Sequence, residues 1–210
     1  MTIPLEIIDL SKTYDSKEAV RNISFKVNEN EIIGILGPNG CGKTTTIGMI
    51  LGLLKPTKGK VLINGIEIEK QRVELLNELN FISPYIELPK KLTVKQNLEV
   101  YGRLYDVKKL GIKIDYLCEK LRLNEFINKI TGELSSGQKN RVSLAKSIIN
   151  DPSVLLLDEP TASLDPETGD FVRSFLEEYQ KEKKTSILLA SHNMAEVERL
   201  CSSVLMMNKG

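Results

Sequence analysis

The stretch GPNGCGKTT at residues 37–45 restricts the fold more than any other part of the sequence. Its three glycines allow a turn that is closed to residues with a Cβ atom, and such a turn points successive backbone N–H groups inward. An apolar segment at residues 31–36 precedes it, and a helix-prone segment at residues 45–54 follows it. A strand, a glycine-rich loop and a helix in this order predict an anion-binding loop, because free N–H groups and the helix dipole attract negative charge.

The spacing within this loop fits the phosphate-binding pattern G-x-x-x-x-G-K-[ST]. We expect Lys43 to reach the β- and γ-phosphates of ATP, Thr44 to bind Mg²⁺ through its hydroxyl, and Thr45 to lie at the α-phosphate. The loop residues expected to bind ATP are Gly37, Pro38, Asn39, Gly40, Cys41, Gly42, Lys43, Thr44 and Thr45. The plain alternative is an ordinary strand-to-helix turn with a solvated lysine.

Composition indicates an ordinary folded domain. The chain has 210 residues, of which 41% are hydrophobic, and this is ample for a core. The 29 basic and 28 acidic residues form no basic stripe, so we expect no nucleic-acid partner. Three scattered cysteines suggest neither a metal site nor a disulfide framework, which favours a reducing, cytoplasmic setting. We find neither a signal-peptide pattern in the first ten residues nor an apolar run approaching a membrane span.

The rest of the chain alternates between strand and helix patterns. Besides residues 31–36, strands are predicted at residues 5–10, 19–27, 60–64, 80–83, 154–157, 186–190 and 204–207. Besides residues 45–54, helices are predicted at residues 73–79, 93–105, 114–121, 135–149, 165–181 and 194–200. This alternation predicts an α/β fold with a parallel core. The early strands should form a small antiparallel sheet beside it, and the mainly helical residues 85–135 a separate lobe.

Two carboxylates follow the apolar run at residues 154–157. A strand that ends in a carboxylate can deliver an oxygen ligand to the Mg²⁺ side of a phosphate site, and Asp158 takes this role. Glu159 lies one residue further, where it can polarise an attacking water. The alternative is a pair of solvent-facing carboxylates.

Together with the phosphate loop, the motif Leu134-Ser135-Ser136-Gly137-Gln138 resembles the signature of ATP-binding-cassette (ABC) ATPases. The resemblance covers essentially the whole chain. It implies a P-loop NTPase parallel-sheet core with a flanking antiparallel β-subdomain and a helical subdomain. The core would comprise about residues 1–84 and 152–210, and the helical subdomain residues 85–151. Ser135 is also a good helix N-cap, and a helix start can bind a terminal phosphate.

Several site residues follow from this resemblance. Tyr14 resembles the aromatic residue that stacks on adenine, and His192 resembles the switch histidine that contacts the γ-phosphate. The signature residues that would close over the γ-phosphate of an opposite protomer are Ser135, Ser136, Gly137 and Gln138. Asp165 belongs to the motif Ser163-Leu164-Asp165, which resembles the loop that links the two sites of a dimer. For Tyr14 and His192 the alternatives are structural roles.

One position departs from the family pattern. The family usually has a glutamine at the end of the strand before the helical lobe, where it touches Mg²⁺ or the attacking water. Ser83 holds that position here, and Gln71 and Gln96 are out of register. A serine hydroxyl is shorter, so we expect it to reach the ion only through water. The departure puts metal geometry and coupling to a membrane partner in question, and leaves nucleotide binding unaffected.

The resemblance implies a function and partners. Two ATP molecules would be held in a head-to-tail dimer, and hydrolysis at Glu159, Lys43 and His192 would reopen it. A separate transmembrane permease would hold the protein at the inner face of the membrane. The segments at residues 100–105 and 191–201 resemble those of exporter subunits for drugs, lipids or polysaccharides. The alternatives are a soluble ABC ATPase and a weakly hydrolysing regulatory cassette. The family usually continues beyond residue 210 into another strand, so we expect the sequence to be a fragment or a minimal domain.

Overall fold

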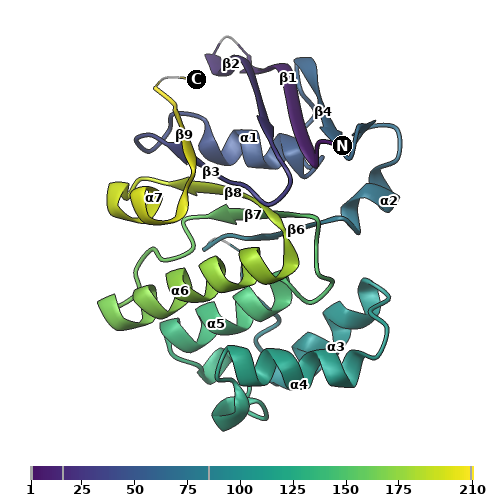
Figure 1. The fold of residues 1–210 in the computed structure, drawn as a ribbon, viewed down its shortest axis with the longest axis vertical. Coiled ribbons are helices and arrows are strands. Elements are labelled where there is room, and N and C mark those ends of the chain that lie inside the picture. Colours follow the sequence, from purple (N-terminus) through teal and green to yellow (C-terminus); the bar gives the residue numbers. More distant parts are fainter. Residues whose placement is uncertain (1, 16, 85, 209) are drawn as a thin grey trace.

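A parallel sheet forms the centre of the computed structural model, which describes residues 2–15, 17–84, 86–208 and 210. Its strands are β3 (Ile32–Leu36), β6 (Leu79–Ile82), β7 (Val154–Asp158), β8 (Ser186–Ser191) and β9 (Ser203–Met206). They lie in the order β6-β7-β8-β3-β9 (Figure 1). Because β3, β7 and β8 are parallel neighbours, their carboxyl ends meet at one edge of the sheet.

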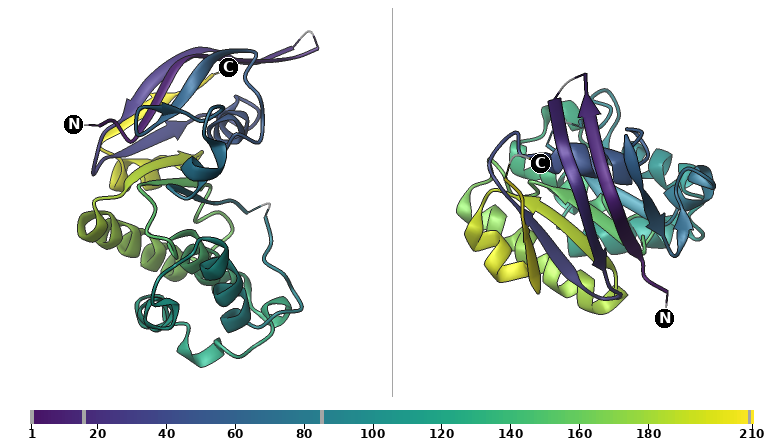
Figure 2. Two further views of the ribbon diagram at one scale, coloured as in Figure 1. Left: turned by 90° about the vertical axis from the view of Figure 1, so that its right-hand side faces the viewer. Right: turned by 90° about the horizontal axis from the view of Figure 1, so that it is seen from above.

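A second, antiparallel sheet covers one side of the molecule (Figure 2). Its strands are β1 (Leu5–Tyr14), β2 (Lys17–Val27), β4 (Lys58–Ile63) and β5 (Ile66–Glu67). The strand predicted at residues 5–10 continues to Tyr14, because β1 pairs with β2 on one side and β4 on the other through irregular register. The predicted strand was therefore four residues too short, and Tyr14 ends the strand instead of following it.

Helices cover the other face of the parallel sheet and fill the space between the sheets. They are α1 (Lys43–Ile50), α2 (Arg72–Leu76), α3 (Val94–Leu104), α4 (Leu110–Lys120), α5 (Ser136–Ser147), α6 (Pro166–Lys183) and α7 (Met194–Leu200), with short 3₁₀ turns at Asn124–Phe126 and Thr131–Glu133. Within the described ranges, none of these helices combines the length and apolarity needed to cross a bilayer. The helix predicted at residues 73–79 stops at Leu76, because Leu79 already belongs to β6 and pairs there with Val154 of β7.

Burial on both faces explains why the central strands are continuous apolar runs. In β7, Leu155 and Leu157 face the core formed with α5 and α6. Val154 and Leu156 face the core formed with α1 and the antiparallel sheet. Side chains alternate between faces with a period of two, so a strand buried on both sides needs apolar residues at every position. The arrangement confirms the predicted α/β class with a parallel core, an antiparallel flanking sheet and a helical part.

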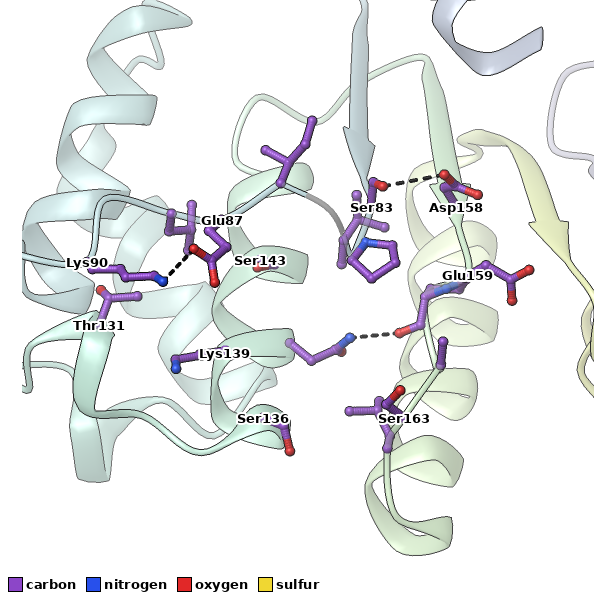
Figure 3. Close-up of a pocket in the computed structure, with 18 residues that line it drawn as sticks. Ser83, Glu87, Lys90, Thr131, Ser136, Lys139, Ser143, Asp158, Glu159 and Ser163 are labelled. Carbon is purple, nitrogen blue, oxygen red and sulfur yellow. Dashed lines mark hydrogen bonds and ion pairs between the residues drawn. The ribbon is translucent and has the colours of Figure 1, made fainter. Parts of the chain in front are cut away.

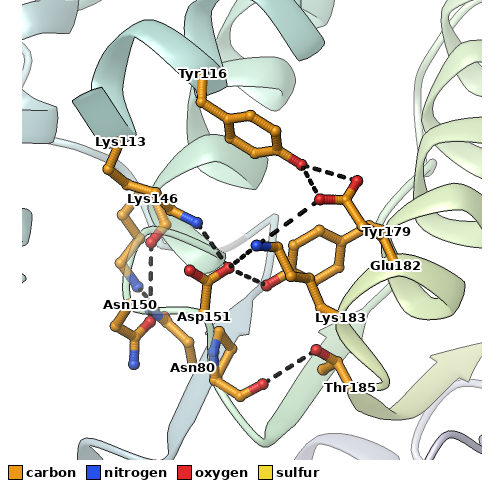
Figure 4. A network of polar contacts seen from close by, with 11 residues as sticks. Asn80, Lys113, Tyr116, Lys146, Asn150, Asp151, Tyr179, Glu182, Lys183 and Thr185 are labelled. Carbon is orange, nitrogen blue, oxygen red and sulfur yellow. Dashed lines mark hydrogen bonds and ion pairs between the residues drawn. The ribbon is translucent and has the colours of Figure 1, made fainter. Parts of the chain in front are cut away.

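A polar network ties the helical part to α6 (Figure 4). The Asp151 carboxylate accepts the Lys113 ammonium at 2.7 Å and the Tyr179 hydroxyl at 3.3 Å, and Lys183 lies 3.6 Å away. Burial lowers the pKa of Lys113, and the hydrogen bond to Asp151 opposes that shift. One carboxylate in the loop before β7 thus anchors both α4 and α6.

Candidate nucleotide-binding site

The glycine-rich loop connects β3 to α1. Its glycines are required for two different reasons, a left-handed backbone conformation and the close approach of other backbone atoms. Gly40 and Gly42 have φ of 81° and 110°, a left-handed conformation that residues with a Cβ rarely adopt. A Cβ on Gly42 would also lie 2.5 Å from the Ala19 carbonyl oxygen. At Gly37 the constraint is close approach, since a Cβ there would lie 2.3 Å from the Met207 carbonyl oxygen. The loop is therefore packed closely against β2 and the end of β9.

Helix α1 begins at Lys43, inside the motif and two residues earlier than predicted. Its N-cap is Gly42, which offers no side-chain acceptor, so the first N–H groups can serve an anion. The Lys43 side chain is only 6% exposed and donates to the Gly37 carbonyl at 2.6 Å. Its ammonium also lies 3.9 Å from Glu159 Oε1. The geometry places a cation and a ring of N–H donors around the loop, which suits phosphate groups.

Oxygen atoms gather beside the loop at the carboxyl end of β7. The hydroxyls of Thr44 and Ser83 lie 3.5 Å and 3.4 Å from Asp158 Oδ2. Burial raises the pKa of the Asp158 carboxyl, and the nearby Glu159 charge raises it further. Hydroxyl and carboxylate oxygens are the hard ligands that Mg²⁺ prefers, and this ion usually keeps several waters. The donor set therefore fits Mg²⁺.

Glu159 and His192 meet where β7 and β8 end. His192 Nδ1 lies 2.8 Å from Glu159 Oε2, and the imidazole is largely exposed while the carboxylate is 12% exposed. Glu159 has φ of +50°, which is uncommon for a residue with a side chain. Its backbone N–H donates to the Ala190 carbonyl at 2.8 Å, which holds the turn against β8. The pair faces the phosphate loop through the contact with Lys43.

Tyr14 lies at the rim of the same cleft. The cleft has a volume of about 860 Å³ and includes Tyr14, Ala19, the loop from Gly42 to Thr45, and both carboxylates of residues 158 and 159. Tyr14 is 44% exposed, and the Lys12 ammonium lies 5.0 Å from its ring centroid. Tyr14 is therefore partly exposed at the cleft, and its contact with Lys12 is the basis of the alternative structural role.

The predicted signature residues form a helix start outside that cleft. Ser135 Oγ accepts the Gln138 backbone N–H at 3.2 Å, and the Gln138 side chain accepts the Ser135 N–H at 3.1 Å. None of residues 135–138 lines the cleft of Tyr14 and the loop. Ser136 instead lies on one wall of a second cavity of about 220 Å³, and Glu159 and Ser163 lie on the opposite wall (Figure 3).

Asp165 lies outside the cleft as well. Its carboxylate accepts the Thr168 backbone N–H at 2.9 Å and caps α6, and these hydrogen bonds lower the pKa of Asp165. Thus the structure brings together the phosphate loop, Tyr14, Asp158, Glu159 and His192. Residues 135–138 and Asp165 do not line this cleft, and Ser136 lies in the second cavity.

The family model described as ABC transporter matches residues 20–162. The chain belongs to this family. It is accordingly an ATP-binding and ATP-hydrolysing cassette of the ABC transporter type, which confirms the resemblance found in the sequence.

Known proteins are similar over nearly the whole cassette. It is 35% identical to the ABC transporter ATP-binding protein NatA of Bacillus subtilis, over 98% of this chain and 86% of that protein. It is 36% identical to the Nod factor export ATP-binding protein I of Rhizobium etli, over 98% of this chain and 66% of that protein.

Two solved structures are also similar over the entire chain. One is the ATP-binding subunit of an ABC transporter. The match includes 87% of that protein, with a TM-score of 0.91 and 28% identity. The other is cbiO1 from Clostridium perfringens, part of the ABC transporter complex cbiONQ, which is covered to 86% with a TM-score of 0.87 and 29% identity.

Two side chains near Glu159, those of Asn140 and Glu196, were not identified from the sequence of the cassette. Asn140 of α5 donates from its side-chain amide to the Pro160 carbonyl at 2.7 Å. Glu196 of α7 lies almost completely buried and accepts two hydroxyl groups. A signal for Glu196 existed, because it occupies the same helix face as the apolar residues Val197 and Leu200. An acid on an apolar helix face requires a polar partner.

Proposed function

We propose that this cassette drives transport through a separate membrane subunit, and that Glu159 polarises the water that attacks the γ-phosphate of ATP. One observation carries the proposal: the Glu159 carboxylate lies between Lys43, at 3.9 Å, and His192, at 2.8 Å, beside the phosphate loop. A carboxylate held at this edge can orient water while Lys43 and His192 contact the phosphate oxygens.

The remaining residues of the cleft would bind and orient the nucleotide. Thr44 and Asp158 would hold Mg²⁺, with Ser83 contributing through a water molecule. A bound ion would neutralise charge on the phosphate oxygens. The loop N–H groups would hold the phosphates, and Tyr14 would stack on the adenine at the rim of the cleft. The partial exposure of Tyr14 and the oxygen set around Asp158 support these assignments.

The location of the signature residues supports action as a dimer. Residues 135–138 form a capped helix start and are exposed or half-buried, yet they do not line the chain's own nucleotide cleft. Such a helix start can bind an anion, so we propose that it binds the γ-phosphate held by a second copy. Asp165 and its loop would lie between the two sites. Two ATP molecules would then close a head-to-tail dimer, and hydrolysis would reopen it.

The membrane partner is proposed from the relatives. NatA is named an ABC transporter ATP-binding protein, and cbiO1 is part of the ABC transporter complex cbiONQ. We propose that residues 85–151 form a helical subdomain that transmits closure of the dimer to a permease at the inner face of the cell membrane. Residues 1–84 and 152–210 would then form the core that carries the nucleotide. The Nod factor export protein supports export as the direction of transport.

The experiment that tests this function is substitution Glu159→Gln. Glutamine keeps the size of the side chain and removes its capacity as a base, so ATP binding should be retained. Turnover should fall by at least about a hundredfold, in the range that general base catalysis contributes. Steady-state hydrolysis and ATP affinity are measured on the same preparations. Unchanged turnover would remove Glu159 from its role.

A second substitution, Lys43→Ala, tests the phosphate loop independently. The ammonium should make charge-assisted hydrogen bonds to phosphate, each of which contributes about 1.5–3 kcal/mol. We therefore expect ATP affinity to fall by about tenfold or more. Lys60→Ala is the matched control, because Lys60 is an exposed lysine of β4 that does not line the cleft. Equal ATP affinity of the wild type and Lys43→Ala would contradict the assignment.

A weakly hydrolysing regulatory cassette is the second candidate, and Ser83 favours it. Ser83 stands at the end of β6 where the family usually has a glutamine, and its hydroxyl lies 3.4 Å from Asp158. Turnover with Mg²⁺ decides between the candidates. If Ser83→Gln raises the rate several-fold, Ser83 limits hydrolysis and the regulatory function is supported.

A further inference from the structure

Glu196 is a buried carboxylate with two short hydrogen bonds. It belongs to α7 and is 2% exposed. Its Oε1 accepts the Thr161 hydroxyl at 2.7 Å, and its Oε2 accepts the Ser191 hydroxyl at 2.7 Å. In the described part of the chain, no basic side chain forms an ion pair with it. Burying a carboxylate is costly unless its oxygens are satisfied, so these two hydroxyls are its essential partners.

The two hydroxyls lie on the segments that carry Glu159 and His192. Thr161 is two residues after Glu159, and Ser191 is the residue before His192. The carboxylate of Glu196 therefore bridges the turn after β7 and the turn after β8. The Glu159–His192 contact of 2.8 Å bridges the same two turns at the cleft. The two contacts together close a ring of hydrogen-bonded side chains and backbone.

The turn that carries Glu159 needs such support. Glu159 has φ of +50°, a conformation that is unfavourable for a residue with a side chain and persists only where the surroundings hold it. The Asn140 amide holds the Pro160 carbonyl from the other side, at 2.7 Å. Ser191 is itself fixed, because its hydroxyl oxygen also accepts the Asn193 N–H at 3.1 Å.

We infer that Glu196 is a positioning residue for ATP hydrolysis, which clamps the turns of Glu159 and His192 through Thr161 and Ser191. The inference rests on the proposed role of Glu159. The clamp touches neither nucleotide nor water. It sets the separation and orientation of the two side chains that do, so its loss affects the rate of the chemical step more than ATP binding.

Thr161→Val and Thr161→Ser provide the test. Valine has nearly the same shape as threonine and lacks the hydroxyl, whereas serine keeps it. A hydrogen bond to a charged group contributes enough that its loss should lower kcat about tenfold to a hundredfold in Thr161→Val. ATP affinity should stay within about twofold, and Thr161→Ser should retain most of the wild-type kcat. Urea unfolding of each variant verifies that the fold is intact.

Two further measurements separate positioning from a general structural effect. Glu196→Met keeps the length of the side chain and removes both acceptor oxygens, so it should lower kcat at least as much as Thr161→Val. The double variant should be little worse than Glu196→Met alone, because the Thr161–Glu196 contact is already lost. Glu198→Gln is the control on the exposed face of the same helix and should be unchanged. His192 is the chain's one histidine, so its imidazole ¹⁵N signals are assigned without ambiguity. Those signals should shift in Thr161→Val and Glu196→Met, and stay in place in Glu198→Gln.

The outcomes are distinguishable. Wild-type kcat in Thr161→Val, or equal losses in Thr161→Val and Thr161→Ser, would overturn the clamp. A loss of ATP affinity that accounts for the loss of activity would also overturn it. If Glu159→Gln hydrolyses ATP normally, the proposed function itself fails. If Glu159→Gln is inactive and Thr161→Val is fully active, only the clamp fails.

Discussion

Lys146 shows how one residue's surroundings produce a measurable pH dependence. Its ammonium lies 4.7 Å and 5.2 Å from the ring centroids of Phe81 and Tyr101 and donates to Asn80 Oδ1 at 3.0 Å. Burial lowers the pKa of Lys146 to about 8, because the charged form loses water. The rings and the amide oxygen favour the cation, but no carboxylate lies among these contacts. Lys146 thereby joins α5 to β6, the strand that leads to Ser83.

The lowered pKa of Lys146 predicts a pH effect on stability. Below pH 8 the folded and unfolded chains are both protonated here, and the cost of burying the cation applies in full. Between about pH 8 and 10.5 the unfolded chain binds more protons, so the free energy of unfolding rises with pH. Lys146→Met should remove this rise in the free energy of unfolding. The rise is at most about 3 kcal/mol, because each unit of pKa shift corresponds to about 1.4 kcal/mol. Urea unfolding at pH 7 and pH 9.5 measures it. An unchanged difference between the two pH values in Lys146→Met would contradict the account.

At the scale of elements, α5 and α3 begin with the same capping arrangement, and only α5 is proposed to meet a phosphate. Thr93 and Gln96 form the reciprocal pair in α3, as Ser135 and Gln138 do in α5. Aspartate caps a helix about as well as serine or threonine, but its charge repels phosphate. The two helix starts therefore offer a matched pair of positions at which capping and phosphate binding can be separated.

Ser135→Asp should leave the free energy of unfolding within about 0.5 kcal/mol of the wild type, because the cap is preserved. It should lower ATPase activity by more than tenfold, since the new carboxylate faces the γ-phosphate across the dimer. Thr93→Asp should change neither quantity. Calorimetry or urea unfolding gives the stability, and steady-state kinetics gives the activity. Full activity in Ser135→Asp would show that the α5 start does not approach phosphate.

Elements specified by local sequence were predictable. The strand, glycine loop and helix at residues 31–54, the capping pair of Thr93 and Gln96, and the Asp165-Pro166 start of α6 all depend on neighbours in the chain. Boundaries were less accurate where pairing across the fold extends an element, as in β1. The region at residues 85–135 is less helical than expected, because the buried Asn97 side chain binds Thr131, and Thr93 pairs with Ile130, in place of further helix.

Part of the candidate site could not be predicted, because it depends on contacts between distant segments. The Thr161–Glu196 and Asn140–Pro160 hydrogen bonds join residues 35 and 20 positions apart in the chain. The left-handed conformation of Glu159 has no glycine to signal it. The sequence did predict that Lys43, Asp158 and Glu159 lie near one another, because each stands in a loop motif or at the end of an apolar strand. His192 was named only through the family resemblance.

At the scale of the whole molecule, the helix start of α5 does not line the nucleotide cleft of its own chain. Ser136 lines a second cavity together with Asp158 and Glu159, and we propose that a phosphate held in the loop of one copy meets residues 135–138 of another copy. Each site would use the loop, Asp158 and Glu159 of one copy and residues 135–138 of the other. Hydrolysis should then depend on the concentration of the chain, as a reaction of the dimer, while ATP binding to the loop should be a property of the monomer.

The most direct test is the specific rate of Mg-ATP hydrolysis measured over a range of protein concentrations, with sedimentation recording the oligomeric state at each. We predict that the rate per chain rises with concentration as the dimer forms, and that it vanishes at every concentration in Glu159→Gln. A rate per chain that stays constant through the range in which the chain sediments as a monomer would contradict the shared site.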